Sequence, residues 1–382
     1  MKRVLMLASV ASMIDQFNMP NIALLQKLGY EVDVACNFIE GNTCSDERVA
    51  ELKQKLQDMH VCCYQIDFAR NIKHMGQNMR ALRQVEGLMK QNGYAFCHCH
   101  SPIGGVVARI AGHRTKTKVI YTAHGFHFYQ GAPLVNWLVY YPVEKALSRW
   151  TDVLITINHE DYALAKKKFH MKKLKYIPGV GIDTERETLS LQEKLKKRQE
   201  LEIPSDAFLI TCAAEFTPNK NQKTVIEAIQ QLNHPNIYFV MCGIGEKKEE
   251  LEAYVWEHQL EDHIRFVGFR KDLHEILQAS DCFVLSSFRE GLSVALMEAM
   301  AEGLPVVCGR IRGNVDLIKD GKDGILVSPG EEKDYEEAFR KLYEMKQKAF
   351  QKFENIGLNN RNKVEAFSKE TVDQIMKKVY QV

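Results

Sequence analysis

Several features that mark other classes of protein are missing from this sequence. None of its apolar runs approaches the ~20 residues that a membrane-spanning helix requires. It contains no Asp-x-Asp, a short acidic motif that would hold a divalent cation. No basic stretch is interleaved with aromatic residues, which argues against nucleic acid as a partner. What is left is an ordinary globular composition, 45% hydrophobic and 26% charged over 382 residues, which is long enough for two domains.

A disulfide framework is also missing, although the chain has ten cysteines. The cysteines stand singly inside apolar runs such as "LITCAA" and "PVVCG". This usage is typical of reduced thiols and predicts a cytoplasmic protein. The segment Cys97–His100 reads "CHCH", but on a strand its cysteines face one side and its histidines the other, so we expect no metal site there.

The first ten residues, "MKRVLMLASV", look like the basic and apolar regions of a signal peptide. Asp15 follows early, however, and no small-residue cleavage site comes cleanly after the apolar run. We therefore expect this segment to form a first buried strand.

Charge is unevenly distributed along the chain. Residues 1–182 hold 23 Lys and Arg against 14 Asp and Glu, a balance of +9, and the remainder holds 28 against 35, a balance of −7. The basic half is expected to meet an anionic partner, such as the inner face of the plasma membrane; a solvated surface with no partner is the alternative. The helix expected at 133–149 could lie there with nearby lysines, Lys166–Lys168, Lys172 and Lys173. Its apolar residues are nevertheless expected to belong to the core.

Apolar strands alternate with helical patterns twice along the chain. The first series runs from "KRVLMLAS" to "DVLITIN", and the second starts at "FLITCAAE", after "IPGVGID". Each series predicts a parallel sheet with helices on both faces. The predicted fold class is therefore α/β, with two Rossmann-like domains whose parallel sheets face a central cleft. We place the domains at 1–182 and 183–360, with a C-terminal helix at 361–382 that packs back on the first domain.

The stretch "SSFREGLSVALMEAMAEGLP", residues 286–305, carries two glutamates after a strand. Glu290 is expected in a loop, and Glu298 about two turns inside the helix that follows Gly291. The start of that helix leaves backbone N–H groups free to bind an anion, those of Leu292, Ser293 and Val294. The spacing rules out a pair of acids that share a proton and favours one elongated ligand. The alternative is an ordinary helix with two solvated acids.

The segment "REGLSVALMEAMAEGLPVV" resembles the E-x7-E region of retaining glycosyltransferases of family 4. "KLKYIPGVGID" is similar to the boundary signature of that family, and "FVGFRKDLHEILQASDCFVLSS" is similar to the approach to its donor site. The resemblance covers essentially the whole chain. On "YTAHGFHFY" and "IRGNVDLI" it points to bacterial capsular and exopolysaccharide enzymes. It implies the two-domain GT-B architecture.

The resemblance assigns donor-site roles in the second domain. Glu290 would hold the transferred sugar, Glu298 the ribose hydroxyls, and Lys220 the diphosphate. Many members carry an arginine where this sequence has Glu215. Either the phosphates rely more on Lys220 and the helix start, or Arg310 or Arg312 compensates for the missing arginine. The nucleoside of the donor is expected to be uridine. Further donor contacts are expected from Gly243, Gly268, Phe269, Arg270, Gly291 and the three amides at the helix start.

In the first domain, the resemblance places His124 of "TAHG" against the donor sugar. A lone histidine on an apolar strand is otherwise most often a structural residue. His100 and His127 are candidates on the acceptor side. No cofactor and no metal are expected.

These features predict a retaining, metal-independent transfer of a sugar from a nucleotide-sugar to an acceptor hydroxyl. The expected acceptor is a lipid-linked oligosaccharide in cell-surface polysaccharide synthesis. The leaving phosphate would itself act as the base, because no second acid is positioned for a double displacement. Two alternatives stay open: a nucleotide-sugar epimerase of the same architecture, and a non-catalytic partner of another glycosyltransferase.

Overall fold

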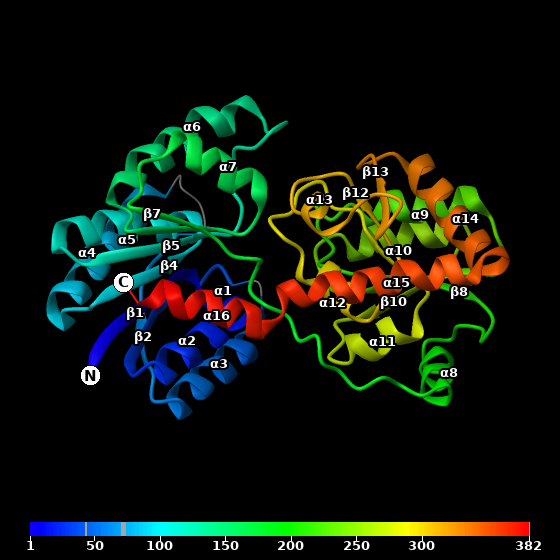
Figure 1. Cartoon of the computed structure of the whole chain (residues 1–382), viewed down its shortest axis with the longest axis horizontal. Coiled ribbons are helices and arrows are strands. Elements are labelled where there is room, and N and C mark those ends of the chain that lie inside the picture. Colours follow the sequence, from blue (N-terminus) through cyan, green and yellow to red (C-terminus); the bar gives the residue numbers. More distant parts are fainter. Residues whose placement is uncertain (43, 70–73, 382) are drawn as a thin grey trace. The chain divides into compact units, whose positions relative to one another are not determined.

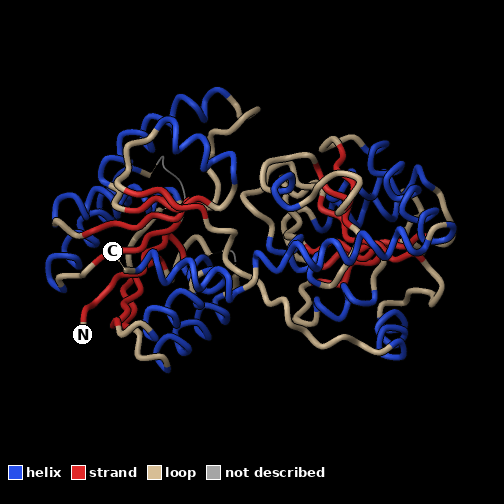
Figure 2. The backbone as a smooth tube through the Cα atoms, viewed as in Figure 1, coloured by secondary structure: helices blue, strands red, loops and turns tan. Residues whose placement is uncertain are grey.

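The structure is a computed structural model that describes residues 1–42, 44–69 and 74–381. Its contacts divide the chain into two compact units (Figure 1). Unit 1 consists of Met1–Val180 and Val372–Val382, and unit 2 of Gly181–Thr371. Each unit has one parallel sheet at its centre with helices around it (Figure 2). The predicted α/β class with two parallel sheets is confirmed.

The sheet of unit 1 has seven strands in the order β3-β2-β1-β4-β5-β6-β7. The strands are β1 Lys2–Val10, β2 Tyr30–Asn37, β3 Cys62–Gln65, β4 Phe96–His100, β5 Lys118–Ala123, β6 Val153–Thr156 and β7 Lys173–Tyr176. The apolar core of "KRVLMLASV" makes β1 a buried central strand, as predicted. The strand order reverses between β1 and β4, and open α/β sheets bind ligands at such a reversal, beyond the carboxyl ends of the strands.

The helices of unit 1 begin and end at residues with suitable local chemistry. The Ser45 hydroxyl accepts a hydrogen bond from the backbone N–H of Arg48 at the start of α3, and Gly93 ends α4 in the left-handed conformation. The helices are α1 Ala11–Phe17, α2 Met19–Lys27, α3 Asp46–Asp58, α4 Met75–Asn92, α5 Pro102–Thr115, α6 Leu134–Leu147, η1 Ser148–Trp150 and α7 His159–Lys168.

The end of helix α16 (Lys369–Tyr380) completes the core of unit 1. Val372, Met376 and Tyr380 join the same apolar cluster as residues of β1. The Tyr380 ring is fully buried and stacks on Phe96 with their centroids 5.8 Å apart. The rest of the segment 361–382, which holds the end of α15 and all of η2, belongs to unit 2.

The sheet of unit 2 has six strands in the order β10-β9-β8-β11-β12-β13, and it reverses between β8 and β11. The strands are β8 Phe208–Ala213, β9 Ile237–Cys242, β10 Ile264–Gly268, β11 Cys282–Leu285, β12 Val306–Gly309 and β13 Gly324–Val327. Its helices are α8 Leu191–Glu200, α9 Gln222–Leu232, α10 Lys248–Glu257, α11 Leu273–Ala279, α12 Val294–Ala301, α13 Asn314–Leu317, α14 Glu332–Lys348, α15 Phe350–Val364 and η2 Glu365–Phe367.

Helix α6 differs from the prediction for residues 133–149. The prediction that its apolar residues belong to the core is confirmed for Leu147 and for the aromatic residues, which pack on the core. It is wrong for Leu134, Val135 and Leu138, which are exposed. The buried residues of α6 are Glu144 and Leu147. Among the described residues, no helix is long and apolar enough to cross a membrane.

Candidate functional site

Two loops of unit 2 are joined at the carboxyl edge of its sheet, where the strand order reverses between β8 and β11. The backbone N–H of Phe288 donates to the carbonyl of Asn219 at 2.9 Å. The Ser286 hydroxyl donates to the carbonyl of Lys220 at 2.8 Å, and the Asn219 amide donates to the carbonyl of Arg289 at 3.0 Å. These bonds hold the loop after β8 against the loop after β11.

Lys220 and Glu290 form an ion pair across these two loops. The Lys220 ammonium lies 2.7 Å from Oε1 of Glu290. Both side chains are partly buried, which strengthens their attraction relative to a pair on an open surface. The fold therefore brings together two residues that lie 70 positions apart in the chain. The family resemblance had assigned both to the same ligand.

Helix α12 begins at Val294, two residues later than predicted. Ser293 is its N-cap residue, and the Ser293 hydroxyl accepts from the backbone N–H of Leu296 at 3.3 Å. Leu292 is a buried residue of the preceding loop. The first amides of the helix are therefore those that follow Ser293, and they carry the positive end of the helix dipole.

The loop that contains Arg312 packs directly on this segment. Gly313 has a φ of +83°, and a Cβ there would approach the carbonyl oxygen of Gly291 to 2.5 Å. Arg312 is buried beside it. Arg310, by contrast, forms an exposed ion pair with Asp320. Gly313 thus brings the segment that carries Arg312 next to the loop of Glu290.

Glu298 lies about one turn inside α12, not two, because the helix starts late. Its Oε1 accepts from the guanidinium of Arg186 at 3.4 Å, and Arg186 also lies 3.7 Å from Glu302. Burial raises the pKa of Glu298, and Arg186 opposes that shift. Sequence reasoning missed Arg186 because 112 positions separate it from Glu298 and no local pattern links them.

The loops after β9 and β10 meet through backbone atoms. The N–H of Gly243 donates to the carbonyl of Gly268 at 2.8 Å, and a Cβ on Gly243 would overlap the carbonyl of Ala214. Gly243 is therefore required for packing, apart from any role toward a ligand. Phe269 is 71% exposed. The Arg270 guanidinium donates a hydrogen bond to the Asp272 carboxylate and so lowers the pKa of Asp272.

Three histidines gather at the carboxyl ends of β4 and β5 in unit 1. Nδ1 of His100 lies 3.0 Å from Nε2 of His124. His98 is bonded at both nitrogens, to the Tyr380 hydroxyl at 3.0 Å and to the Thr122 hydroxyl at 2.8 Å. Nε2 of His100 is buried and has no hydrogen-bond partner among the described residues. Helix α16 thus supports the histidine cluster through Tyr380.

These histidines are neutral at physiological pH. Burial lowers the pKa of His98 to about 3 and that of His124 to about 4, and it lowers the pKa of His100 well below its ordinary value. A cavity of about 20 Å³ adjoins the cluster. Its lining includes His100 and His124. A neutral His124 can donate or accept one hydrogen bond to a hydroxyl without a charge change.

The third candidate histidine of unit 1 has other neighbours. The His127 ring stacks on Tyr140 with centroids 4.7 Å apart, and the His127 carbonyl accepts from Asn136 of α6 at 2.9 Å. His127 therefore links its loop to α6, whereas His100 and His124 pair with each other.

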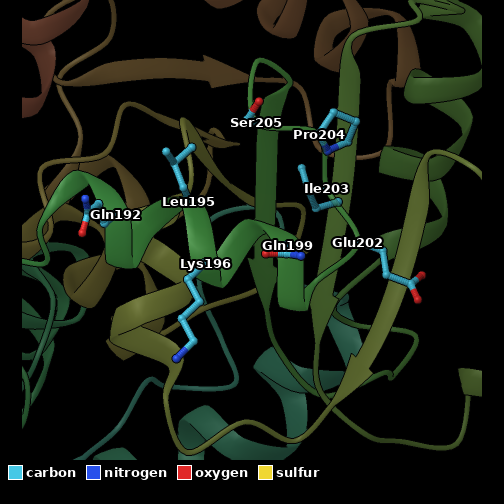
Figure 3. Close-up of a pocket in the computed structure, with 8 residues that line it drawn as sticks. All are labelled: Gln192, Leu195, Lys196, Gln199, Glu202, Ile203, Pro204 and Ser205. Carbon is cyan, nitrogen blue, oxygen red and sulfur yellow. The ribbon is translucent and has the colours of Figure 1, made fainter.

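A separate hollow of about 680 Å³ lies beside α8 in unit 2 (Figure 3). It is lined by Gln192, Leu195, Lys196, Gln199, Glu202, Ile203, Pro204 and Ser205. None of these lining residues belongs to the predicted site, and Lys196 is the single cation among them. Over the part of the chain that the structure describes, no group of three or more His, Cys, Asp and Glu could hold a metal ion.

The chain matches known proteins along most of its length. Residues 22–186 match the family model described as glycosyltransferase family 4, and residues 193–362 match that described as glycosyl transferases group 1. EpsD of Bacillus subtilis, named as a glycosyltransferase, is 36% identical over 349 residues, which cover 90% of this chain and 87% of EpsD. The chain belongs to glycosyltransferase family 4. The predicted family and enzyme class are confirmed.

One further sequence relative and two solved structures are similar to this glycosyltransferase. An Escherichia coli enzyme, UDP-Gal:alpha-D-GlcNAc-diphosphoundecaprenol alpha-1,3-galactosyltransferase, is 31% identical over 266 residues, 68% of each chain. HepE of Anabaena, solved with UDP-glucose, superposes with a TM-score of 0.79 at 20% identity over the whole of both chains. WaaG, a glycosyltransferase involved in lipopolysaccharide biosynthesis, gives 0.73 at 16% identity, covering 98% of this chain and 99% of WaaG. The GT-B fold class is confirmed.

Proposed function

We propose that this glycosyltransferase transfers a sugar from a UDP-sugar to a hydroxyl of a lipid-linked acceptor in cell-surface polysaccharide synthesis. The observation that carries the proposal is the Lys220–Glu290 pair at the strand reversal, next to the start of α12. Relatives support it: the Escherichia coli enzyme is named for a UDP-sugar and a diphosphoundecaprenol acceptor, and HepE was solved with UDP-glucose. The proposed place of action is the cytoplasmic face of the plasma membrane.

The leaving diphosphate is assigned to the positive groups of unit 2. As the bond between the anomeric carbon and the phosphate oxygen breaks, negative charge grows on that oxygen. Lys220 and the first amides of α12 supply fixed positive charge at this point, and Arg312 packs beside the same loop. Electrostatic groups that are already in place stabilise such a charge most effectively.

The donor's other groups are assigned to the two glutamates and to His124. Glu290 would accept hydrogen bonds from sugar hydroxyls, and Glu298 from the ribose hydroxyls. His124 would bond the transferred sugar through a neutral imidazole. We propose that the acceptor oxygen attacks on the face that the phosphate leaves, and that its proton passes to the leaving phosphate, so that the anomeric configuration is retained.

Metal independence is part of this proposal, because lysine, arginine and helix amides supply the charge that a cation would otherwise provide. We expect full activity in excess EDTA. Loss of activity on chelation, with recovery on addition of Mn²⁺, would contradict it.

A thermal-shift screen of nucleotide-sugars tests the donor assignment. We expect UDP-sugars to raise the melting temperature more than ADP-, GDP- or CMP-sugars do, and Lys220→Ala to abolish the increase. No stabilisation by any nucleotide-sugar would sink the proposal. Product NMR after incubation with the donor alone then separates a transferase from an epimerase, since only an epimerase converts the donor's sugar without an acceptor.

A further inference from the structure

Helix α6 presents a continuous apolar face to the outside of unit 1. Five of its aliphatic side chains are between 41% and 80% exposed, and they recur on one side of the helix: Leu134, Val135, Leu138, Val139 and Val143. Pro142 and Ala146 lie on the same side and are also exposed. Single exposed apolar residues are common, but a contiguous patch marks a surface that binds something.

The opposite face of α6 is firmly attached to unit 1. Trp137 and Tyr141 pack on Phe128, with ring centroids 5.6 Å and 5.5 Å apart. The Glu144 carboxylate accepts two hydrogen bonds from the buried guanidinium of Arg109, at 2.7 Å and 3.1 Å. The apolar face is therefore held outward by specific contacts and is not the result of a loosely packed helix.

Positive charge borders this face. All fourteen residues of α6 are described, and their single acid, Glu144, is buried and paired. Lys145 lies at the edge of the apolar face, with its ammonium 5.8 Å from the centroid of Tyr141. Tyr141 also contacts Phe169, which directly follows Lys166–Lys168 at the end of α7. Tyr141 thus joins α6 to the residue that follows the three lysines of α7.

We propose that α6 lies in the headgroup region of an anionic lipid bilayer, with its apolar face among the acyl chains and the lysines at the lipid phosphates. A helix with one apolar face, bordered by lysines, is suited to this position. A second copy of the chain fits less well, because a symmetric contact through this face would bring the lysines beside α6 against those of the partner. The lipid-binding surface is inferred from α6 itself. Only its purpose, which is access to a lipid-linked acceptor, rests on the proposed function.

Vesicle binding by the full chain tests this surface. The probes are vesicles of equal parts phosphatidylglycerol and phosphatidylcholine, and vesicles of phosphatidylcholine alone. We expect the wild-type protein to bind the anionic vesicles at least ~10-fold more tightly, and Leu134→Gln/Leu138→Gln to weaken that binding at least ~10-fold. The matched control is Leu191→Gln/Leu195→Gln, an identical change at the same spacing on the exposed face of α8, which should bind as the wild type does.

A second pair of measurements separates insertion of α6 into lipid from association between copies of the chain. Leu138→Trp should show a blue shift in its fluorescence on addition of anionic vesicles, and replacing Lys166–Lys168 with glutamine should weaken the dependence of binding on salt. If the wild type does not bind anionic vesicles, or if the α6 and α8 variants bind equally, the inference is wrong. It is also wrong if α6 substitution instead converts a dimer to a monomer in light scattering. UDP-sugar binding measured in the same variants should not change, so this inference and the donor-site proposal can fail separately.

Discussion

The Lys220 ammonium and the Glu290 carboxylate of this glycosyltransferase lie 2.7 Å apart and neutralise each other across two loops. A diphosphate that binds Lys220 must therefore compete with Glu290 for the same ammonium. When it does, the Glu290 carboxylate becomes available for sugar hydroxyls. Donor binding would thus exchange one ion pair for two sets of ligand contacts within a single site.

Replacing Lys220 with alanine should lower the rate of sugar transfer by about 10²–10³-fold, because the leaving diphosphate loses a preorganised positive charge. The rate is measured as release of nucleoside diphosphate from the donor that the thermal-shift screen identifies. Lys223→Ala removes a lysine from the exposed face of α9, next in the chain, and should leave the rate within about twofold of wild type. Equal rates for both variants would show that Lys220 has no role in transfer.

Replacing Glu298 with glutamine should weaken UDP binding by about 10-fold, since a carboxylate accepts hydrogen bonds from two ribose hydroxyls more strongly than a neutral amide does. Calorimetric titration of UDP measures the change. Glu302→Gln is the matched control, because Glu302 lies one turn further along the chain and faces the same Arg186. A similar loss in both variants would mean that Arg186, and not a ribose contact, accounts for the effect.

Replacing Glu144 with glutamine should destabilise unit 1 by about 3 kcal/mol, because Arg109 would be left as a buried charge without its counterion. Tryptophan fluorescence during guanidinium unfolding reports mainly on unit 1, which contains Trp137 and Trp150, once Trp256 of unit 2 has been changed to phenylalanine. Glu86→Gln breaks exposed pairs with Lys90 and Arg114 and should cost much less stability than Glu144→Gln does. If Glu144→Gln costs no more stability than this control, Glu144 is not the required counterion of buried Arg109.

The stability of unit 1 should fall as the pH drops below about 6.5, the ordinary pKa of histidine. The pKa of buried His98 is about 3, so between these values the unfolded chain binds a proton that the folded chain does not. His98 alone should remove about 1 kcal/mol between pH ~7.5 and pH ~5.5. Over the same pH interval, the free energy of unfolding of His98→Gln should fall by about this amount less than that of the wild type. His100 and His124 are the same in both proteins. An identical pH dependence would show that His98 is not held neutral.

The sequence was sufficient to predict the parallel sheets and the segment around Glu290, since both follow from local patterns. Alternating apolar and helical segments define the strands, and a strand, loop and helix in succession place the candidate site at the strand reversal. The late start of α12 was not predicted, because Ser293 could serve equally well inside the first turn or as its cap. Such a choice depends on how the preceding loop packs, as Gly313 does on Gly291.

Contacts between distant residues could not be predicted from the sequence. The pairing of Arg186 with Glu298 and of His98 with Tyr380 depends on the tertiary fold alone, because the partners share no repeat or spacing. The exposed face of α6 was missed for a related reason. An apolar helix pattern predicts that one face is buried, but the aromatic residues of α6 and Glu144 occupy the inner face, so its aliphatic residues face outward.

Helix α16 affects how the protein is made in the cell. Unit 1 consists of the first 180 residues together with residues that are synthesised only after roughly 190 residues of unit 2. At a translation rate of about 5–20 residues per second, the ribosome needs about 10–40 s to add that intervening length. During this interval the groove that receives Tyr380 has no helix to fill it, and the apolar side chains beside Phe96 and His98 are open to solvent and to chaperones. The final fold of unit 1 therefore forms only after the whole of unit 2 has been synthesised.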